Sequence, residues 1–208
     1  MARPSSDDDR NSPARTERRR QILDAAKVVF ADAGYHGASI GAIIDRAEIA
    51  RGTFYLYFES KEAVFGALLD LAMADLRERI VHVDTAVAAP PPEVQLLDGI
   101  ARVLEYIVAD RPLAIVLLSS TWTPDAEAAE RLQTFYDEIR AVIARSLVEG
   151  AALGILRPVA VERSAAALLG LVRGIIEYCI THSDEVDGKI GEVTRELVDV
   201  ALRGVLRR

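Results

Sequence analysis

Apolar residues recur at helical spacing along most of this sequence, and this periodicity limits the fold more than any other feature. The first clear stripe holds Ile22, Ala26, Val29, Phe30 and Ala33, spaced so that their side chains share one face of a helix. Alternation of apolar and polar residues, which is typical of a half-buried strand, does not appear. The sequence therefore predicts an all-α fold of about nine helices.

Residues that begin or end helices divide the chain. Ser39 and Ser60 stand where an N-cap hydroxyl is favoured, and Ser12-Pro13 adds a proline in the first turn. Gly34 suits the position that follows a helix end, and residues 88–92 (AAPPP) form the clearest linker. We expect helices over residues 13–33, 39–47, 50–56, 60–82, 93–109, 112–122, 124–152, 161–182 and 189–206.

The charge of the chain is unevenly distributed. The net charge is −7, which for the whole chain argues against binding to nucleic acid, because phosphates attract cations. Residues 10–20, however, hold five arginines against a single glutamate. Such a run, taken alone, is most simply a solvated segment, but it gains weight if a nucleic-acid-binding element adjoins it.

Several features favour the cytoplasm. Cys179 is the only cysteine, so an intramolecular disulfide cannot form and nothing indicates a secreted scaffold. Residues 1–20 are polar and charged, unlike a signal peptide. Arg173 and Glu177 interrupt the apolar stretch 165–180, which argues against a membrane span. We expect a cytoplasmic protein with no membrane segment.

An enzyme is the first alternative class of protein. The motifs H-E-x-x-H and G-x-S-x-G and the phosphate-binding loop do not occur in the sequence. The histidines, His36, His82 and His182, are far apart in the sequence. We therefore expect no catalytic residue, no cofactor and no bound metal.

Residues 39–58 (SIGAIIDRAEIARGTFYLYF) fit a helix-turn-helix. Ile43, Ala47 and Ile49 can fill the angle between two short helices, and Phe54 and Phe58 suit the core. The second helix would then enter the major groove of DNA. The residues left to face DNA, or to approach it closely, are Arg51, Gly52, Thr53, Tyr55, Tyr57 and Lys61, with Ser39 in front of the first helix.

The segment 52–62 (GTFYLYFESKE) resembles the signature of the tetracycline-repressor-like (TetR) family, as do residues 20–30 and Gly34-Tyr35. The resemblance covers roughly residues 15–70. It implies that Arg51, Thr53 and Tyr55 face base edges or adjacent phosphates. It also implies contacts to the DNA backbone from Ser39, Tyr57 and Lys61, and contacts to a flanking phosphate or the minor groove from Arg15 and Arg18.

Two residues depart from the family pattern. Glu48 stands where glycine is usual in the turn, and it has to adopt a conformation that glycine enters more easily. Ala50 stands where serine or threonine usually caps the recognition helix, so no side chain can accept the capping hydrogen bond. Ala50 still belongs to the predicted DNA-binding set by its position.

The composition of residues 1–11 predicts a disordered tail. The resemblance implies two further parts. Residues 12–60 form the DNA-binding domain, whose connecting helix runs on to about residue 82, and residues 61–208 form a helical domain that binds an effector and dimerises. The helices at 161–182 and 189–206 are apolar over much of their surface, which suits a four-helix interface between two chains. The predicted interface residues are Leu168, Val172, Ile175, Ile176, Cys179, Val193, Leu197, Val198 and Ala201.

The central helices hold aromatic side chains that can line an effector pocket. The predicted pocket residues are Tyr106, Trp122, Phe135, Tyr136 and Ile139, although core packing explains each of them equally well. The scarcity of charge within the apolar stripes favours an uncharged or hydrophobic effector.

The resemblance predicts a homodimeric repressor that binds a palindromic double-stranded DNA operator and leaves it when an unidentified small molecule binds. A helical module that contacts protein through its helix-turn-helix is the alternative outside the enzymes, and an activator is a variant of the DNA-binding reading. Arg51, Tyr55, Tyr57 and Lys61 suit a phosphate surface better than an apolar partner.

Overall fold

The computed structural model describes residues 13–80, 84, 86, 88–118, 126–186 and 188–202, except for the side chains of residues 93, 197 and 200–202. The predicted tail 1–11, His82 and Trp122 lie outside this range, as do the side chains of Leu197 and Ala201. The described residues form ten helices: α1 (Pro13–Gly37), α2 (Ile40–Arg46), α3 (Arg51–Tyr55), α4 (Lys61–Arg79), α5 (Pro92–Ala109), α6 (Arg111–Leu118), α7 (Ala126–Ala152), α8 (Val161–Thr181), α9 (Ser183–Val186) and α10 (Ile190–Leu202). The prediction of an all-α fold is confirmed.

The helix boundaries follow the local signals in the sequence. The Ser39 hydroxyl accepts a hydrogen bond from the Ala42 amide at 3.1 Å, and Ser60 accepts one from the Ala63 amide at the same distance. Gly34 leaves helical geometry with φ 68° and ψ 166°, and a short turn continues α1 to Gly37. These three ends therefore form where a side-chain acceptor or a glycine offsets the unpaired backbone groups.

One element differs from the prediction. Residues 183–188 were expected to be a connection without helix, but residues 183–186 form the one-turn helix α9. Val186 explains this turn, because its side chain is buried against the main core. A single turn carries too few apolar residues to show a periodicity.

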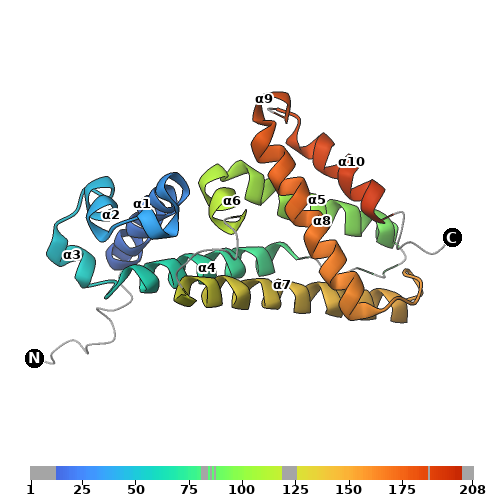
Figure 1. The fold of residues 1–208 in the computed structure, drawn as a ribbon. Helices are drawn as coiled ribbons and strands as arrows, with labels where there is room; N and C mark the ends of the chain where they lie inside the picture. The colour runs from blue at the N-terminus through green and yellow to red at the C-terminus, as the bar shows by residue number, and fades with distance from the viewer. Residues whose placement is uncertain are drawn as a thin grey trace, which may run out of the picture.

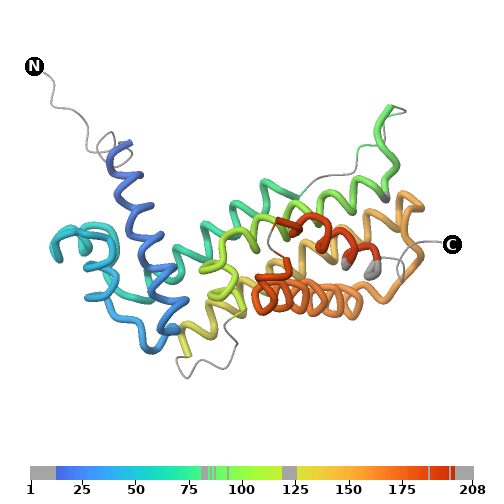
Figure 2. The backbone as a smooth tube through the Cα atoms, turned by 90° about the horizontal axis from the view of Figure 1, so that it is seen from above, coloured from blue at the N-terminus to red at the C-terminus, as the bar shows by residue number. Residues whose placement is uncertain are grey.

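The helices are arranged in two regions that α4 joins. The first region consists of α1, α2 and α3, and α4 runs from it along the length of the molecule beside α7 (Figure 1). The second region consists of α5 to α10, with α8 and α10 at the end away from α3 (Figures 1 and 2).

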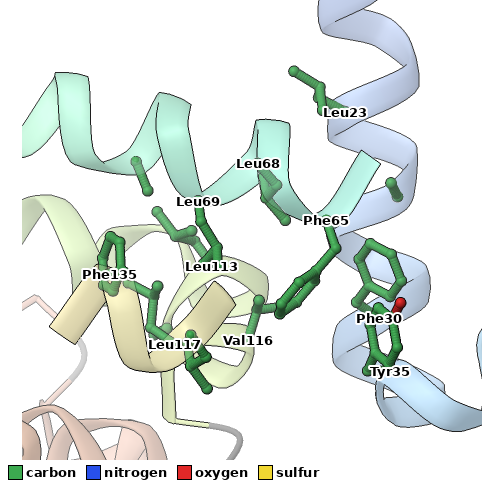
Figure 3. Close-up of a cluster of buried hydrophobic side chains, with 14 of the residues drawn as sticks. Leu23, Phe30, Tyr35, Phe65, Leu68, Leu69, Leu113, Val116, Leu117 and Phe135 are labelled. Carbon is green, nitrogen blue, oxygen red and sulfur yellow. The ribbon is translucent and has the colours of Figure 1, made fainter. Parts of the chain in front are cut away.

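The two regions share one continuous core. Phe30 and Tyr35 of α1 pack against Phe65 of α4, with ring centroids 5.3 Å and 4.9 Å from that of Phe65. Figure 3 shows Phe65 between these rings and Val116 of α6. Since α6 also packs along α1, a displacement of α6 or α4 changes the surroundings of the first region.

Candidate DNA-binding surface and ligand cavity

The turn between α2 and α3 is held by α1. The Gln21 side chain donates a hydrogen bond to the carbonyl of Ala47 at 2.7 Å, and Arg18 donates one to the Gln21 side chain, also at 2.7 Å. Ile43 and Ala47 are buried and Ile49 is half-buried, as the helix-turn-helix prediction requires. Arg18 therefore supports the turn as well as carrying charge at the surface.

The two departures from the family pattern have the predicted local effects. Glu48 adopts φ 51°, the left-handed region that glycine enters without steric cost. Ala50 is the N-cap residue of α3 and its side chain makes no capping hydrogen bond. The turn is thus built with a strained residue, and the recognition helix begins with one fewer partner for its free amides.

The exposed face of α3 carries a guanidinium and a phenol side by side. The Arg51 guanidinium carbon lies 5.7 Å from the centroid of the Tyr55 ring, and an Arg51 nitrogen lies 3.4 Å from the Tyr55 hydroxyl. Both side chains and Gly52 are exposed, while Thr53 is half-buried. This pair presents hydrogen-bond donors to solvent on the element that a helix-turn-helix inserts into DNA.

Tyr57 is more buried than the sequence analysis predicted. It is half-buried and packs against the main core. The Arg15 guanidinium carbon lies 5.2 Å from its ring centroid, and Arg15 also donates to the Leu56 carbonyl at 3.4 Å. Tyr57 therefore fixes Arg15 beside the recognition helix, while part of its own surface remains open to a backbone phosphate.

Lys61 has an internal role that sequence reasoning missed. Its ammonium group donates to the carbonyls of Tyr35 at 2.8 Å and Ala38 at 3.3 Å, and it lies 4.3 Å from the Tyr35 ring centroid. Two of its three protons therefore serve the loop between α1 and α2, and the contact of Lys61 with a phosphate, which would use the third proton, stays a prediction.

Leu56 is a surface residue that the sequence analysis left out. It follows α3 directly and its side chain is 70% exposed. An apolar side chain at this place can contact the methyl group of thymine in the major groove. Periodicity could not reveal this position, because a leucine beside a helical stripe is expected to be buried.

A cavity of about 230 Å³ lies in the second region. Its walls come from α4, α5, α6, α7 and α8 together with Leu156, and apolar side chains dominate the lining. A mostly apolar hollow with a few polar groups is typical of a site for a small molecule.

Three of the five predicted effector residues, Phe135, Tyr136 and Ile139, line this cavity. Tyr106 does not: it donates a hydrogen bond of 2.5 Å to Asp75, and the Arg79 guanidinium stacks 3.9 Å from its ring centroid. Burial, with the hydrogen bond to Asp75, holds the pKa of Tyr106 well above its ordinary value, so Tyr106 is a neutral link between α4 and α5. This part of the prediction is corrected.

Comparison with known proteins supports a family assignment. The model of bacterial regulatory proteins of the tetR family matches residues 22–68. The HTH-type transcriptional repressor KstR of Mycolicibacterium smegmatis (strain ATCC 700084 / mc(2)155) is 30% identical over 147 residues, which cover 70% of this chain and 70% of KstR. The chain belongs to the TetR family.

Other TetR family members extend the comparison. The HTH-type transcriptional repressor DhaR of Mycobacterium sp. (strain GP1) is 34% identical over 94 residues, 45% of this chain, and the chain spans about half of DhaR's own length, 47%. The structure of FadR from Bacillus subtilis in complex with stearoyl-CoA has the same fold, with a TM-score of 0.71 and 22% identity, over 87% of this chain and 96% of FadR. These relatives are regulators, not enzymes.

Within the part of the chain described by the structure, no group of three His, Cys, Asp or Glu side chains could hold a metal ion.

The predicted dimer residues of this TetR family chain divide into two groups. Ile175, Ile176, Cys179 and Val198 are buried in the core of the single chain, so the interface prediction is corrected for these four: no surface is left for a partner. Leu168, Val172 and Val193 are half-buried. The periodicity of α8 predicts an apolar helix, but it does not show which face of that helix packs against the core of the same chain.

The opposite face of α8 is exposed. A Cβ atom added at Gly170 or Gly174 would meet no atom within 4 Å, so a second helix could approach the backbone closely there. The same helix is long and apolar enough to cross a membrane, with a mean hydropathy of 1.4, a property shared by helices that are covered on more than one side. The exposed small and apolar residues of this face are Ala166, Ala167, Gly170, Leu171, Gly174 and Tyr178, and the charged residues Arg163 and Glu177 are exposed on it as well.

Proposed function

We propose that this chain is a cytoplasmic transcriptional repressor, which binds a palindromic operator as a homodimer and leaves it when a small molecule fills the cavity. The observation that carries the proposal is the exposed Arg51–Tyr55 pair on α3, set on a helix-turn-helix that shares its core with the cavity-bearing region. DhaR and KstR are named transcriptional repressors, which favours repression over activation.

Two helices connect the cavity to the DNA-binding region. Met73 and Leu76 of α4, and Ile80 just beyond its end, line the cavity. A short connection, residues 56–60, joins α3 to the start of α4 at Lys61. Leu117 and Leu118 of α6 line it as well, and α6 packs along α1. A ligand that binds better to one position of α4 and α6 would shift the recognition helices of the dimer relative to each other.

The exposed face of α8 suits the dimer contact. The small residues Ala167, Gly170 and Gly174 would let α8 of a second copy approach closely, with Leu171 and Tyr178 adding apolar area. A two-fold axis through this face would present two α3 helices to two half-sites of a palindrome.

The test is fluorescence anisotropy with a labelled duplex from the region upstream of the chain's own coding sequence, against a scrambled duplex, at two salt concentrations. We expect preference for the upstream duplex and weaker binding at higher salt, because phosphate contacts release counterions. Arg51→Ala should weaken binding by about tenfold or more.

Arg102→Ala is the matched control, because Arg102 is an exposed arginine on α5, a helix outside both the helix-turn-helix and the proposed dimer face of α8. It should leave the affinity for DNA unchanged. Absence of binding to either duplex at low salt would overturn the proposal.

A further inference from the structure

The cavity contains one charged side chain among the residues described by the structure. Its 24 lining residues include Gln95 and Ser146 as neutral polar residues and Arg173 as the single ionic one. The sequence analysis favoured an uncharged effector because the apolar stripes carry few charges. In the sequence, Arg173 interrupts the apolar run of α8, and helical periodicity does not indicate that it faces a cavity.

Arg173 lies against an aromatic face rather than against a carboxylate. Its guanidinium carbon is 4.5 Å from the centroid of the Tyr136 ring. Within the described residues, no Asp or Glu oxygen lies within 4.0 Å of it. The side chain is half-buried, so its charge has lost part of its hydration, and the ring offsets only a fraction of that loss.

The Tyr136 hydroxyl has no proton left to donate to a carboxylate. The hydroxyl donates to the carbonyl of Leu117, and burial raises the pKa of Tyr136 although the nearby Arg173 acts in the opposite direction. The phenol therefore stays protonated and engaged. The hydrogen-bonding capacity on this wall of the cavity belongs to Arg173, whose planar fork matches a carboxylate.

The cavity also limits the size of the ligand. A volume of about 230 Å³ holds about eight groups the size of a methylene, and because the cavity is partly open to solvent, the end of a slightly longer chain can extend into the opening. The other lining residues offer apolar contact along the walls.

We propose that the effector site takes an amphipathic monocarboxylate with an unbranched or compact apolar body of about eight to ten carbons, whose carboxylate pairs with Arg173. This rests on the proposed function in one respect, that the cavity is the effector site. The carboxylate would supply the counter-charge that Arg173 lacks, and the apolar body would fill the rest of the space.

The test is isothermal titration calorimetry, in which the purified full chain is titrated separately with decanoate, decan-1-ol and decanoyl-CoA. We expect decanoate to bind at least about tenfold more tightly than the alcohol, since a charge-assisted bidentate contact distinguishes them. Arg173→Gln should remove that preference and leave the affinity for the alcohol unchanged. Arg173→Lys keeps the positive charge but loses the planar guanidinium, so it should retain part of the preference for decanoate over decan-1-ol.

Arg102→Gln on α5 is the matched control, since Arg102 is exposed and does not line the cavity, and it should bind all three probes like the original chain. Equal affinity for decanoate and decanol, or tight binding of decanoyl-CoA without binding of decanoate, would overturn the inference. The comparison of decanoate with decanol in the unaltered chain needs no variant, so a misfolded variant would not spoil it.

The outcomes for DNA are separate. If the anisotropy assay shows operator binding and the titrations show no carboxylate preference, only the ligand class is wrong. If decanoate binds through Arg173 and no duplex binds, the proposed repressor function fails instead.

Discussion

The ammonium group of Lys27, on α1, lies 2.5 Å from a carboxylate oxygen of Asp110, at the junction of α5 and α6. The other Asp110 oxygen accepts a hydrogen bond from the Leu113 amide at 3.1 Å. Although burial favours the neutral amine, Asp110 and the nearby Asp24 hold the pKa of Lys27 above its ordinary value. One carboxylate therefore both caps α6 and attaches it to the DNA-binding region.

Asp110→Asn should weaken this attachment while keeping an oxygen for the Leu113 amide. We expect the free energy of unfolding to fall by about 1.5 kcal/mol, the lower end of the range for a hydrogen bond to a charged group, because both side chains are partly exposed. Urea denaturation measures it. Asp24→Asn is the matched control: Asp24 is 3.4 Å from the same ammonium group and its side chain is more exposed, so its loss should cost less. Equal costs would contradict the assignment.

Glu48→Gly should improve both stability and DNA binding. Glycine occupies φ 51° without the cost that glutamate has there, which should stabilise the chain by about 0.5–1 kcal/mol. It also removes a negative charge beside the DNA-facing helix. Thermal unfolding and anisotropy measure the two effects.

Glu48→Gln separates these effects, because glutamine removes the charge but keeps a side chain in the left-handed region. It should raise DNA affinity and leave the unfolding midpoint unchanged. A stabilisation by glutamine equal to that by glycine would show that charge, not backbone strain, limits this turn.

The sequence predicts best what depends on neighbours in the chain. The caps at Ser39 and Ser60 and the break at Gly34 form from interactions within three or four residues, so composition at those positions was sufficient. The burial of Phe54 and Phe58 followed from the helix-turn-helix pattern, which fixes the short-range geometry of α2 and α3.

Interactions between distant segments could not be predicted in this way. Lys61 donates a hydrogen bond to the carbonyl of Tyr35, 26 residues away in the sequence. Arg173 of α8 packs against the ring of Tyr136 on the neighbouring helix α7. Both sides of α8 are largely apolar, so its sequence pattern does not show which side faces the core. Only the packing of α5, α6 and α7 decides that Ile176 faces inward and Gly170 outward.

Leu56→Ala should reduce the sequence preference of DNA binding without affecting the fold. Because 70% of the Leu56 side chain is exposed, its removal leaves no cavity. The loss of an apolar contact with thymine methyl groups should lower operator affinity by about tenfold and leave affinity for the scrambled duplex unchanged. Replacing the operator thymines with deoxyuridine should have the same effect on the original chain and no further effect on the variant.

Leu153→Ala provides the comparison, since Leu153 is also an exposed leucine, 53% accessible, beyond the end of α7. It should leave both affinities unchanged. An unchanged operator affinity for Leu56→Ala would remove Leu56 from the DNA-binding surface.

Glu62 should make stability depend on pH in the acid range. Its carboxylate lies in the first turn of α4 and accepts a hydrogen bond from the Tyr35 hydroxyl at 3.0 Å. Hydrogen bonds from its own backbone amide, from Ser60 and from Tyr35 lower the pKa of Glu62 below its ordinary value of 4.5. The stabilisation is therefore complete above pH 4.5 and is lost as the pH falls through the lowered pKa.

Urea denaturation at a series of pH values from neutral to acid should show a smaller loss of stability for Glu62→Gln than for the original chain, because glutamine does not titrate. Glu59→Gln is the control, since Glu59 is exposed and should leave the pH profile unchanged. Superimposable profiles for the original chain and Glu62→Gln would exclude this contribution.

Gly170→Glu should convert the proposed dimer to a monomer. The position is open to solvent in the single chain, so the substitution leaves the fold intact, but across a two-fold axis it would place two carboxylates close together in an apolar contact. Sedimentation velocity should show a shift from dimer to monomer, and operator affinity should fall because one chain reads only one half-site. Ala141→Glu adds the same charge at an exposed position of α7 and should leave a dimer. If Gly170→Glu also sediments as a dimer, the contact between chains lies on another surface, and the outward face of α8 has a different role.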